Sequence, residues 1–494
     1  MLSRRDLLRG ATGAGIASAL GCVVPPRTPI IREENERPGT TDWQLTKAGL
    51  DAKTRYRCPR IEGYCSHTSI RAGETLEVYV STNPASPFVL DLYRMGYYGS
   101  AGGRHLGHWG PLPGTVQPEP EIGPERLREC RWQSSVKITI PADWPSGVYL
   151  GKLTEAKDGF QSYVIFIVRD DRPCDFLLQA SDLTWSAYNR WPDQWSLYDD
   201  GHKEWYWGPD VRVSFDRPYG RYCQIEDWPL SQGSGEFLLW EFPLVFWMEK
   251  AGYDVSYISN LDTHFDAPGL LRAKGWISTG HDEYWSRAMF DNMKAAVQAG
   301  VNVAFLSANT SNGVIDPSGP RGRAYSRIGV YGEVKPDTLQ AFPEGARFKR
   351  CGLDEGELLG NRTTSPVIGL ADWVCSNSKH WIFEGTGMKD GDAIPGLVGW
   401  EWQGNPAEIP GLEVVARSKL TWSKKEGEYT ATVYPGPKGN VVFSGATIWW
   451  ADGLSAPPGY RRPKRYGGKS VQLKGPDPRV QRITANLFDR FRAP

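Results

Sequence analysis

One stretch of the chain constrains the fold more than any other, because it predicts a strand, a helix and a second strand in immediate succession. Residues 275–280 have the pattern of a short buried strand that ends at Gly280. Residues 286–299 follow with apolar side chains three and four positions apart, which is the spacing of one helical face. Gly300 then stands where the end of a helix favours a left-handed residue, and residues 301–306 are apolar again. This order predicts two parallel strands joined by a helix.

Polar side chains follow both of these strands. His281, Asp282 and Glu283 come directly after the first, and Asn309 follows the second. In open parallel sheets, ligands bind outside the carboxyl ends of the strands. Four polar groups that meet at such an edge therefore predict a functional site, while a simple capping role stays open for Asp282 alone.

The rest of the chain predicts two domains, since 494 residues exceed one small core. Residues 46–170 contain several short alternating strands and no helical stretch, which predicts an immunoglobulin-like β-sandwich. Residues 171–494 alternate strands with helices, which predicts an α/β domain with a mainly parallel sheet. Its clearest predicted elements are a strand at 175–180, a helix at 237–251, a strand at 253–258 and a terminal helix at 480–491. The segment between Tyr188 and Phe237 has little regular pattern, and a connection of that length is typical of a functional loop.

The first 22 residues resemble an export signal. Arg4 and Arg5 form a twin-arginine pattern, and the weakly apolar run at 10–20 is too short for a spanning helix. Residues 19–22 resemble a lipobox, which would place a lipid on Cys22. We therefore expect Tat export to the periplasm or cell surface, with that lipid as the only membrane contact. Residues 23–45 are polar and proline-rich, as expected of a tether.

The composition excludes some partners. The 57 acidic and 57 basic residues balance, which argues against nucleic acid as a partner. The eight cysteines include no CxxC pair, so we do not expect a structural zinc site. Cys58 and Cys65 are near enough in sequence to suggest a small disulfide loop after export. The 21 tryptophans are expected mainly to pack, and a sugar-stacking surface is their less common use.

A family resemblance rests on residues 280–286, Gly-His-Asp-Glu-Tyr-Trp-Ser, and on four supporting blocks at 187–189, 213–219, 307–309 and 399–401. Together they resemble the large (beta) subunit of N,N-dimethylformamidase, over roughly residues 173–494. The resemblance implies a glutamine-amidotransferase-like α/β fold. It also implies amide hydrolysis at one iron that is bound by two tyrosines and a glutamate.

Carried over residue by residue, the resemblance makes Glu283 the ligand carboxylate. Tyr188 and Tyr219 are the predicted phenolate ligands, because each lies in a matching block, and Tyr198 is a competitor for either place. The resemblance also implies three catalytic residues, which are His281, Asn309 and Glu401.

This ligand set has a physical logic of its own. Two phenolates and a carboxylate are hard oxygen donors that suit Fe³⁺ better than zinc. A tyrosine with its ordinary pKa of about 10 needs a strong local cation to ionise at neutral pH. Three protein ligands leave positions for water or a substrate carbonyl. His281 or Glu401 could then pass a proton to the leaving amine, and Asn309 could donate to an oxyanion.

The sequence thus predicts an exported hydrolase of a small linear amide that uses mononuclear Fe³⁺, with a partner subunit and a homo-oligomer left open. Two alternatives also remain open. One is an exported glycan-active or glycan-binding protein that uses Asp282, Glu283 and tryptophans. The other is a non-catalytic cell-surface binding protein that keeps the fold.

Overall fold

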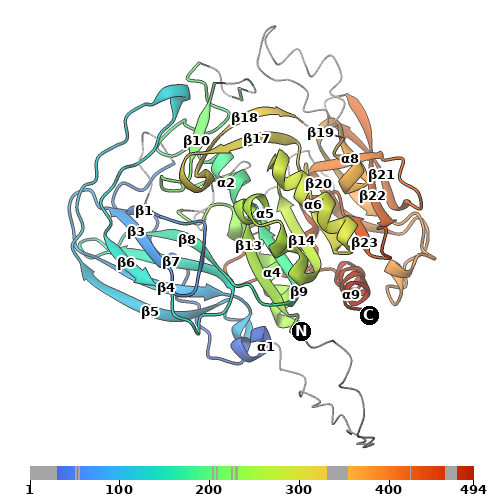
Figure 1. Cartoon of the computed structure of the whole chain (residues 1–494), viewed down its shortest axis with the longest axis horizontal. Helices are drawn as coiled ribbons and strands as arrows, with labels where there is room; N and C mark the ends of the chain where they lie inside the picture. The colour runs from blue at the N-terminus through green and yellow to red at the C-terminus, as the bar shows by residue number, and fades with distance from the viewer. Residues whose placement is uncertain are drawn as a thin grey trace, which may run out of the picture.

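The computed structural model describes residues 30–49, 53, 56–202, 205–206, 208, 210–223, 226–227, 232–330, 354–422, 424–461 and 475–493. The predicted export signal and Cys22 lie outside these residues. Figure 1 shows the N-terminal strands in blue and cyan on one side, the central strands and helices in green and yellow, and the C-terminal strands in orange on the other side. Within the described part of the chain, no helix is long and apolar enough to cross a membrane.

The N-terminal part contains two sheets that share a hydrophobic core, with side chains such as Val78, Leu92 and Phe166 between them. The short helix α1 (Ile30–Asn35) precedes both sheets. One sheet has three strands, β1 (Glu62–Cys65), β3 (Thr75–Ser81) and β6 (Val136–Thr139). The other has five, in the order β2 (Ser69–Arg71), β8 (Gln161–Arg169), β7 (Gly147–Glu155), β4 (Phe88–Met95) and β5 (Gly103–Leu112). The immunoglobulin-like relationship stays a prediction.

A nine-stranded sheet organises the rest of the chain. Its first five strands are parallel: β13 (Val255–Ser259), β9 (Cys174–Ala180), β14 (Ala273–His281), β16 (Asn302–Ala308) and β23 (Val441–Ser444). The other four are antiparallel: β22 (Lys425–Pro435), β20 (Ala393–Pro406), β19 (Asn361–Val374) and β21 (Glu413–Trp422). The prediction of a mainly parallel sheet therefore holds only for the first five strands. The last third of the chain joins most of its strands by short turns, which produce antiparallel pairs, whereas parallel pairs need long crossovers.

Helices cover both faces of the parallel strands. Phe176 and Leu178 of β9 share a core with α4 (Phe242–Lys250) and α9 (Pro478–Arg492). Leu177, which points to the opposite face, shares a second core with α6 (Arg287–Ala299). Successive strand side chains alternate between faces, so one strand serves both cores. The other α-helices among the described residues are α2 (Asp182–Tyr188), α3 (Phe237–Trp240), α5 (Asn260–Phe265) and α8 (Gly356–Leu359).

Two helical segments differ from expectation. The helix predicted at 237–251 is divided into α3 and α4 at Glu241, shortly before Pro243, whose nitrogen has no hydrogen to donate. Residues 182–188, for which the sequence predicted no helix, form α2. Short 3₁₀ helices are η1 (Tyr98–Ser100), η2 (Pro124–Arg126), η4 (Pro268–Arg272), η5 (Pro320–Gly322), η6 (Trp381–Phe383) and η7 (Trp450–Gly453).

A small four-stranded sheet combines one strand that precedes β14 in the chain with three that follow it. Its order is β10 (Arg212–Ser214), β18 (Ala324–Val330), β17 (Gly313–Ser318) and β15 (Tyr284–Ser286). Strand β15 follows the end of β14 directly, so this sheet begins at the predicted site. Strands β11 (Tyr222–Cys223) and β12 (Glu226–Asp227) form a separate pair.

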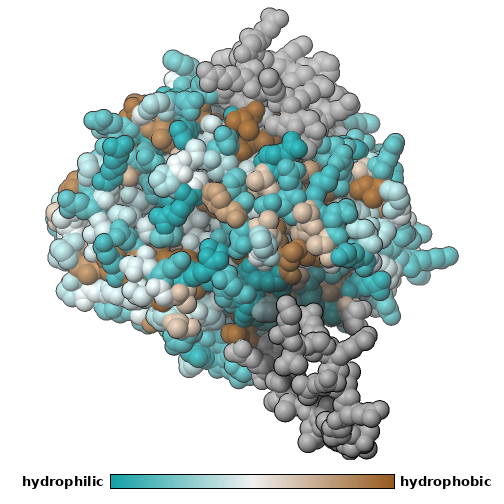
Figure 2. Space-filling view, in the orientation of Figure 1, coloured by the Kyte–Doolittle hydropathy of each residue, from teal (hydrophilic) through white to brown (hydrophobic). Residues whose placement is uncertain are grey.

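A buried ion pair joins the N-terminal strands to the helices of the large sheet. Arg94 of β4 donates from Nη2 to Glu249 Oε1 of α4 at 2.8 Å, and both side chains are 0% exposed. Cys58 and Cys65 are both free and buried, so the predicted loop disulfide is wrong. The extended strand β1 occupies the last part of the segment between them. In Figure 2 hydrophobic side chains are scattered among hydrophilic ones over the visible face.

Candidate functional site

The carboxyl ends of β14 and β16 meet, with His281 paired in register with Ala308. Gly280 turns the chain here with a φ of 72°, and a Cβ at this position would lie 2.5 Å from Trp240 Cβ. Only glycine meets both conditions without strain. The turn is followed by Glu283, whose backbone N–H donates to Thr184 Oγ1 of α2 at 2.9 Å. This contact fixes the Glu283 backbone against the helix that carries Tyr188.

Three oxygen-bearing side chains gather at this turn. Tyr188 Oη donates to Glu283 Oε2 at 2.5 Å, and Tyr198 Oη lies 3.2 and 3.1 Å from Oε1 and Oε2. The two phenol oxygens are themselves 2.5 Å apart, and the rings stack with centroids 4.7 Å apart. All three side chains are buried. A carboxylate and two phenols therefore present their oxygens to one small volume.

Arg217 explains why the irregular segment after α2 brings Tyr198 to this place. Its buried guanidinium donates to five backbone carbonyl groups, at Ser186, Asn189, Trp191, Trp195 and Ser214. Four of these belong to the last turn of α2 or to the loop between Tyr188 and Tyr198. One side chain thus holds the loop that carries both phenols.

The predicted catalytic side chains also lie next to Glu283. His281 Nε2 is 2.6 Å from Glu401 Oε2 and 3.5 Å from Glu283 Oε2, although neither imidazole nitrogen makes a well-aligned hydrogen bond to another described residue. Asn309 Nδ2 donates to Glu401 Oε2 at 3.1 Å. Trp400 meets the His281 ring edge to face, with centroids 5.6 Å apart. The structure therefore brings His281, Asn309 and Glu401 together beside Glu283.

Burial and neighbouring charge shift the pKa values of these groups. Burial, reinforced by the charge of Glu401, raises the pKa of Glu283 to about 7. Burial, and then the charge of Glu283, raises the pKa of both Tyr188 and Tyr198 well above the ordinary value. Burial alone would lower the pKa of His281, but the surrounding carboxylates, Glu401 foremost, together outweigh it and raise the value to about 9. With protein groups alone the two phenols favour their protonated forms, and added positive charge would favour their ionisation.

Asp282 points away from this cluster. Its Oδ2 accepts hydrogen bonds from Gln179 Nε2 and Ser278 Oγ, both at 2.8 Å, and its Oδ1 accepts one from Asn260 Nδ2 at 3.1 Å. Asp282 does not cap helix α6, because the N-cap of that helix is Ser286, whose side chain accepts a hydrogen bond from the N–H of Met289. The geometry gives Asp282 the role of joining β9, β14 and α5 beneath the site.

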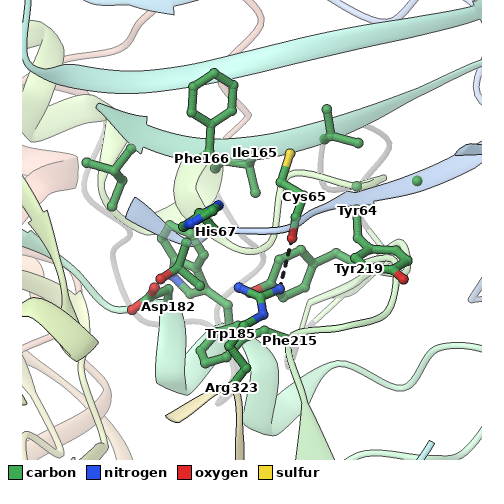
Figure 3. A pocket seen from close by; sticks show the side chains of 15 residues that line it. Tyr64, Cys65, His67, Ile165, Phe166, Asp182, Trp185, Phe215, Tyr219 and Arg323 are labelled. Atoms are coloured by element: carbon green, nitrogen blue, oxygen red, sulfur yellow. Dashed lines mark hydrogen bonds between the residues drawn. The ribbon is translucent and has the colours of Figure 1, made fainter. Parts of the chain in front are cut away.

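The structure does not bring Tyr219 to Glu283. Tyr219 instead lines a separate cavity, shown in Figure 3, together with Asp182, Trp185 and Arg323. Its ring packs edge to face on Trp185, with centroids 6.4 Å apart. Tyr198, the competitor, occupies the place expected for Tyr219. The block at 213–219 contributes Arg217, rather than the Tyr219 hydroxyl, to the region of the cluster.

Sequence reasoning missed two residues behind Tyr198. Tyr284 Oη lies 2.5 Å from Tyr198 Oη, and Arg327 Nη2 donates to Tyr284 Oη at 3.0 Å. Tyr284 adjoins Glu283 in the quoted motif, which is a signal that could have pointed to it. No sequence motif near Arg327 points to the site, because only the pairing of β18 with β17 brings this residue there.

Comparisons with known proteins agree with part of this description. The family described as "N,N-dimethylformamidase beta subunit-like, C-terminal" matches residues 89–464, which is more than half of the chain and begins within the N-terminal strands. No curated protein matches the chain. Among solved structures, a family 123 glycoside hydrolase from Clostridium perfringens aligns at 10% identity, with a TM-score of 0.10. The alignment covers 60% of this chain and 57% of that one, and so low a score carries no argument.

Proposed function

Because the chain belongs to the N,N-dimethylformamidase beta subunit-like family, we propose that it hydrolyses the carbon–nitrogen bond of a small linear amide. Ferric iron held by Tyr188, Tyr198 and Glu283 would be its cofactor. One observation carries the proposal: a buried carboxylate and two buried phenols meet within 3.2 Å of one another, directly beside His281.

The donor set fits a hard cation. Oxygen ligands around a first-row metal ion stand at roughly 2 Å from the metal and thus about 3 Å from one another, which is close to the spacing among these three side chains. Anionic oxygens prefer a hard, highly charged ion to a soft one. Among the described residues no three His, Cys, Asp or Glu side chains form a metal-binding group, and it is phenol oxygens that join Glu283 here.

When bound, ferric iron supplies Lewis-acid chemistry, which polarises a carbonyl group and makes water acidic. The protein supplies the proton transfers. His281 Nε2 and Glu401 Oε2 lie 2.6 Å apart, so either group could carry the proton that is passed to a leaving amine. Asn309 orients Glu401 with one amide N–H and has a second N–H to offer a developing oxyanion. Trp400 packs against His281 and excludes water from that side.

Export remains part of the proposal. The twin-arginine pattern at Arg4 and Arg5 is consistent with transport in the folded state, which would let the protein acquire its metal in the cytoplasm. A lipid on Cys22 would then hold the protein at the membrane surface.

The test is metal analysis and amide hydrolysis by the full chain, compared with Glu283→Ala, Tyr198→Phe and Tyr219→Phe. Purified protein is assayed for iron per chain and for amine release from a panel of formamides and acetamides. We expect about one iron per chain and measurable amine release. Glu283→Ala and Tyr198→Phe should lose both.

Tyr219→Phe is the matched control, because it removes a half-buried phenol that lies outside the cluster. It should keep iron and activity. The proposal fails if the wild-type protein neither retains nor takes up ferric iron, or if Glu283→Ala binds it equally well.

A further inference from the structure

A chain of contacts runs from a buried arginine to the phenol–carboxylate cluster. Arg327 Nη2 donates to Tyr284 Oη at 3.0 Å, Tyr284 Oη is 2.5 Å from Tyr198 Oη, and Tyr198 Oη contacts Glu283. The guanidinium carbon of Arg327 also lies 4.8 Å from the centre of the Tyr198 ring. All three side chains behind Glu283 are at most 2% exposed. A permanent positive charge therefore stands behind one phenol of the cluster.

The small sheet builds this arrangement from its backbone register. Tyr284 of β15 pairs with Gly313 of β17, and Arg327 of β18 pairs with Ile315 of the same strand. A Cβ at Gly313 would lie 2.5 Å from Tyr284 Cε1. The missing side chain at Gly313 lets the Tyr284 ring lie beside β17, where its hydroxyl meets Arg327. The hydrogen bond between Arg327 and Tyr284 thus depends on Gly313 of β17, the strand that lies between β15 and β18.

The two tyrosines of the cluster are not equivalent as a result. The rings of both tyrosines pack edge to face on Tyr284, but only the Tyr198 hydroxyl accepts a hydrogen bond from Tyr284 Oη, and the guanidinium of Arg327 lies over the Tyr198 ring. A cation close to a phenol favours negative charge on its oxygen. A hydrogen bond from a neighbouring hydroxyl both fixes the direction of that oxygen and withdraws charge from it.

We propose that Arg327, acting through Tyr284, is a positioning residue that fixes the Tyr198 oxygen against Glu283 and sets how much charge Tyr198 gives to a bound cation. The metal role of Tyr198 in this statement rests on the proposed function. The geometric role, in which Arg327 and Tyr284 hold the Tyr198 hydroxyl in place, does not.

The variants are Arg327→Met, Arg327→Lys and Tyr284→Phe. Arg323→Met is the matched control, because Arg323 is a buried arginine that precedes the same strand but pairs with Asp216. In the iron-loaded protein, loss of the hydrogen bond or of the positive charge should move the phenolate-to-iron absorption band to longer wavelength. Iron affinity, measured by competition with a chelator, should fall about 10- to 100-fold, as it does when outer partners of metal ligands are removed.

Arg327→Lys keeps the charge and should keep the band nearer to its wild-type position than Arg327→Met does. Arg323→Met should leave both the band and the iron affinity unchanged. A purely structural role predicts lower thermal stability in Arg327→Met with an unmoved band and unchanged iron affinity, and that result would overturn the proposal.

A metal-free measurement separates this inference from the proposed function. In protein labelled with ¹³C at tyrosine Cζ, the Tyr198 resonance is assigned as the one missing from Tyr198→Phe. It should shift in Tyr284→Phe and Arg327→Met and stay in place in Arg323→Met. If wild-type protein binds no iron, the proposed function fails while this shift still supports the positioning role. If the resonance does not move, the positioning role is wrong whatever the protein binds.

Discussion

The buried ion pair between Arg94 and Glu249 gives a sharp prediction about how the N-terminal strands are attached. Arg94 of β4 and Glu249 of α4 form two hydrogen bonds, at 2.8 and 3.0 Å, and neither side chain is exposed. Glu249 also accepts hydrogen bonds from Tyr257 Oη at 2.7 Å and Asn35 Nδ2 at 2.8 Å. Glu249→Gln keeps the volume but leaves the arginine cation buried without its counter-charge.

Removal of one partner from a buried pair costs about 3–5 kcal/mol. We expect Glu249→Gln and Arg94→Met each to lower the free energy of unfolding by roughly that amount, with the double variant less destabilised than the sum by about 2–3 kcal/mol. The assay is urea denaturation followed by circular dichroism and by tryptophan fluorescence. If each single change costs less than about 1 kcal/mol and the two effects are additive, the pair does not hold the two parts together and the reasoning is refuted.

Three further predictions concern stability away from the phenols. Burial raises the pKa of Asp182 to about 8, so the folded protein keeps a proton that the unfolded chain loses above about pH 4. Its contribution to stability should therefore fall as pH rises from about 4 to 8, by up to about 1.4 kcal/mol per unit. Asp182→Asn should become more stable relative to wild type between pH 5 and 7 in urea denaturation, and a pH-independent difference would contradict this. Ser286→Ala removes the hydrogen bond that caps α6 and should cost about 1 kcal/mol, measured as a lower thermal midpoint. Gly300→Ala should cost about 1–2 kcal/mol in the same assay, because Gly300 has a φ of 105° while the added carbon meets only ordinary contacts; an unchanged midpoint would exclude that strain.

The strand, helix and strand at the centre of the chain could be predicted almost residue by residue. Helix α6 extends over Arg287–Ala299, Ser286 caps it, and Gly300 ends it in the left-handed conformation. These features are local, since they depend on periodicity and on cap residues within one segment. The positions of His281, Glu283 and Asn309 followed from them, because strand ends at one sheet edge are neighbours.

The second phenol could not be predicted, because its position depends on tertiary contacts. Tyr198 lies in a segment without periodicity, and the guanidinium of Arg217 determines where that segment runs. Nothing in the spacing of Tyr198 or Tyr219 distinguishes a phenol that reaches Glu283 from one that packs on Trp185. The antiparallel half of the sheet was also missed, because the strands of the last third were recognised in the sequence but their pairing directions were not.

The most direct test of the central claim is the visible absorption spectrum of the protein loaded with ferric iron. Phenolate ligation predicts a phenolate-to-iron charge-transfer band that is lost or strongly reduced in Tyr188→Phe and in Tyr198→Phe, and that persists in Tyr219→Phe. A band that persists in Tyr198→Phe and disappears in Tyr219→Phe, or no band in wild-type protein that has bound iron, would contradict the account.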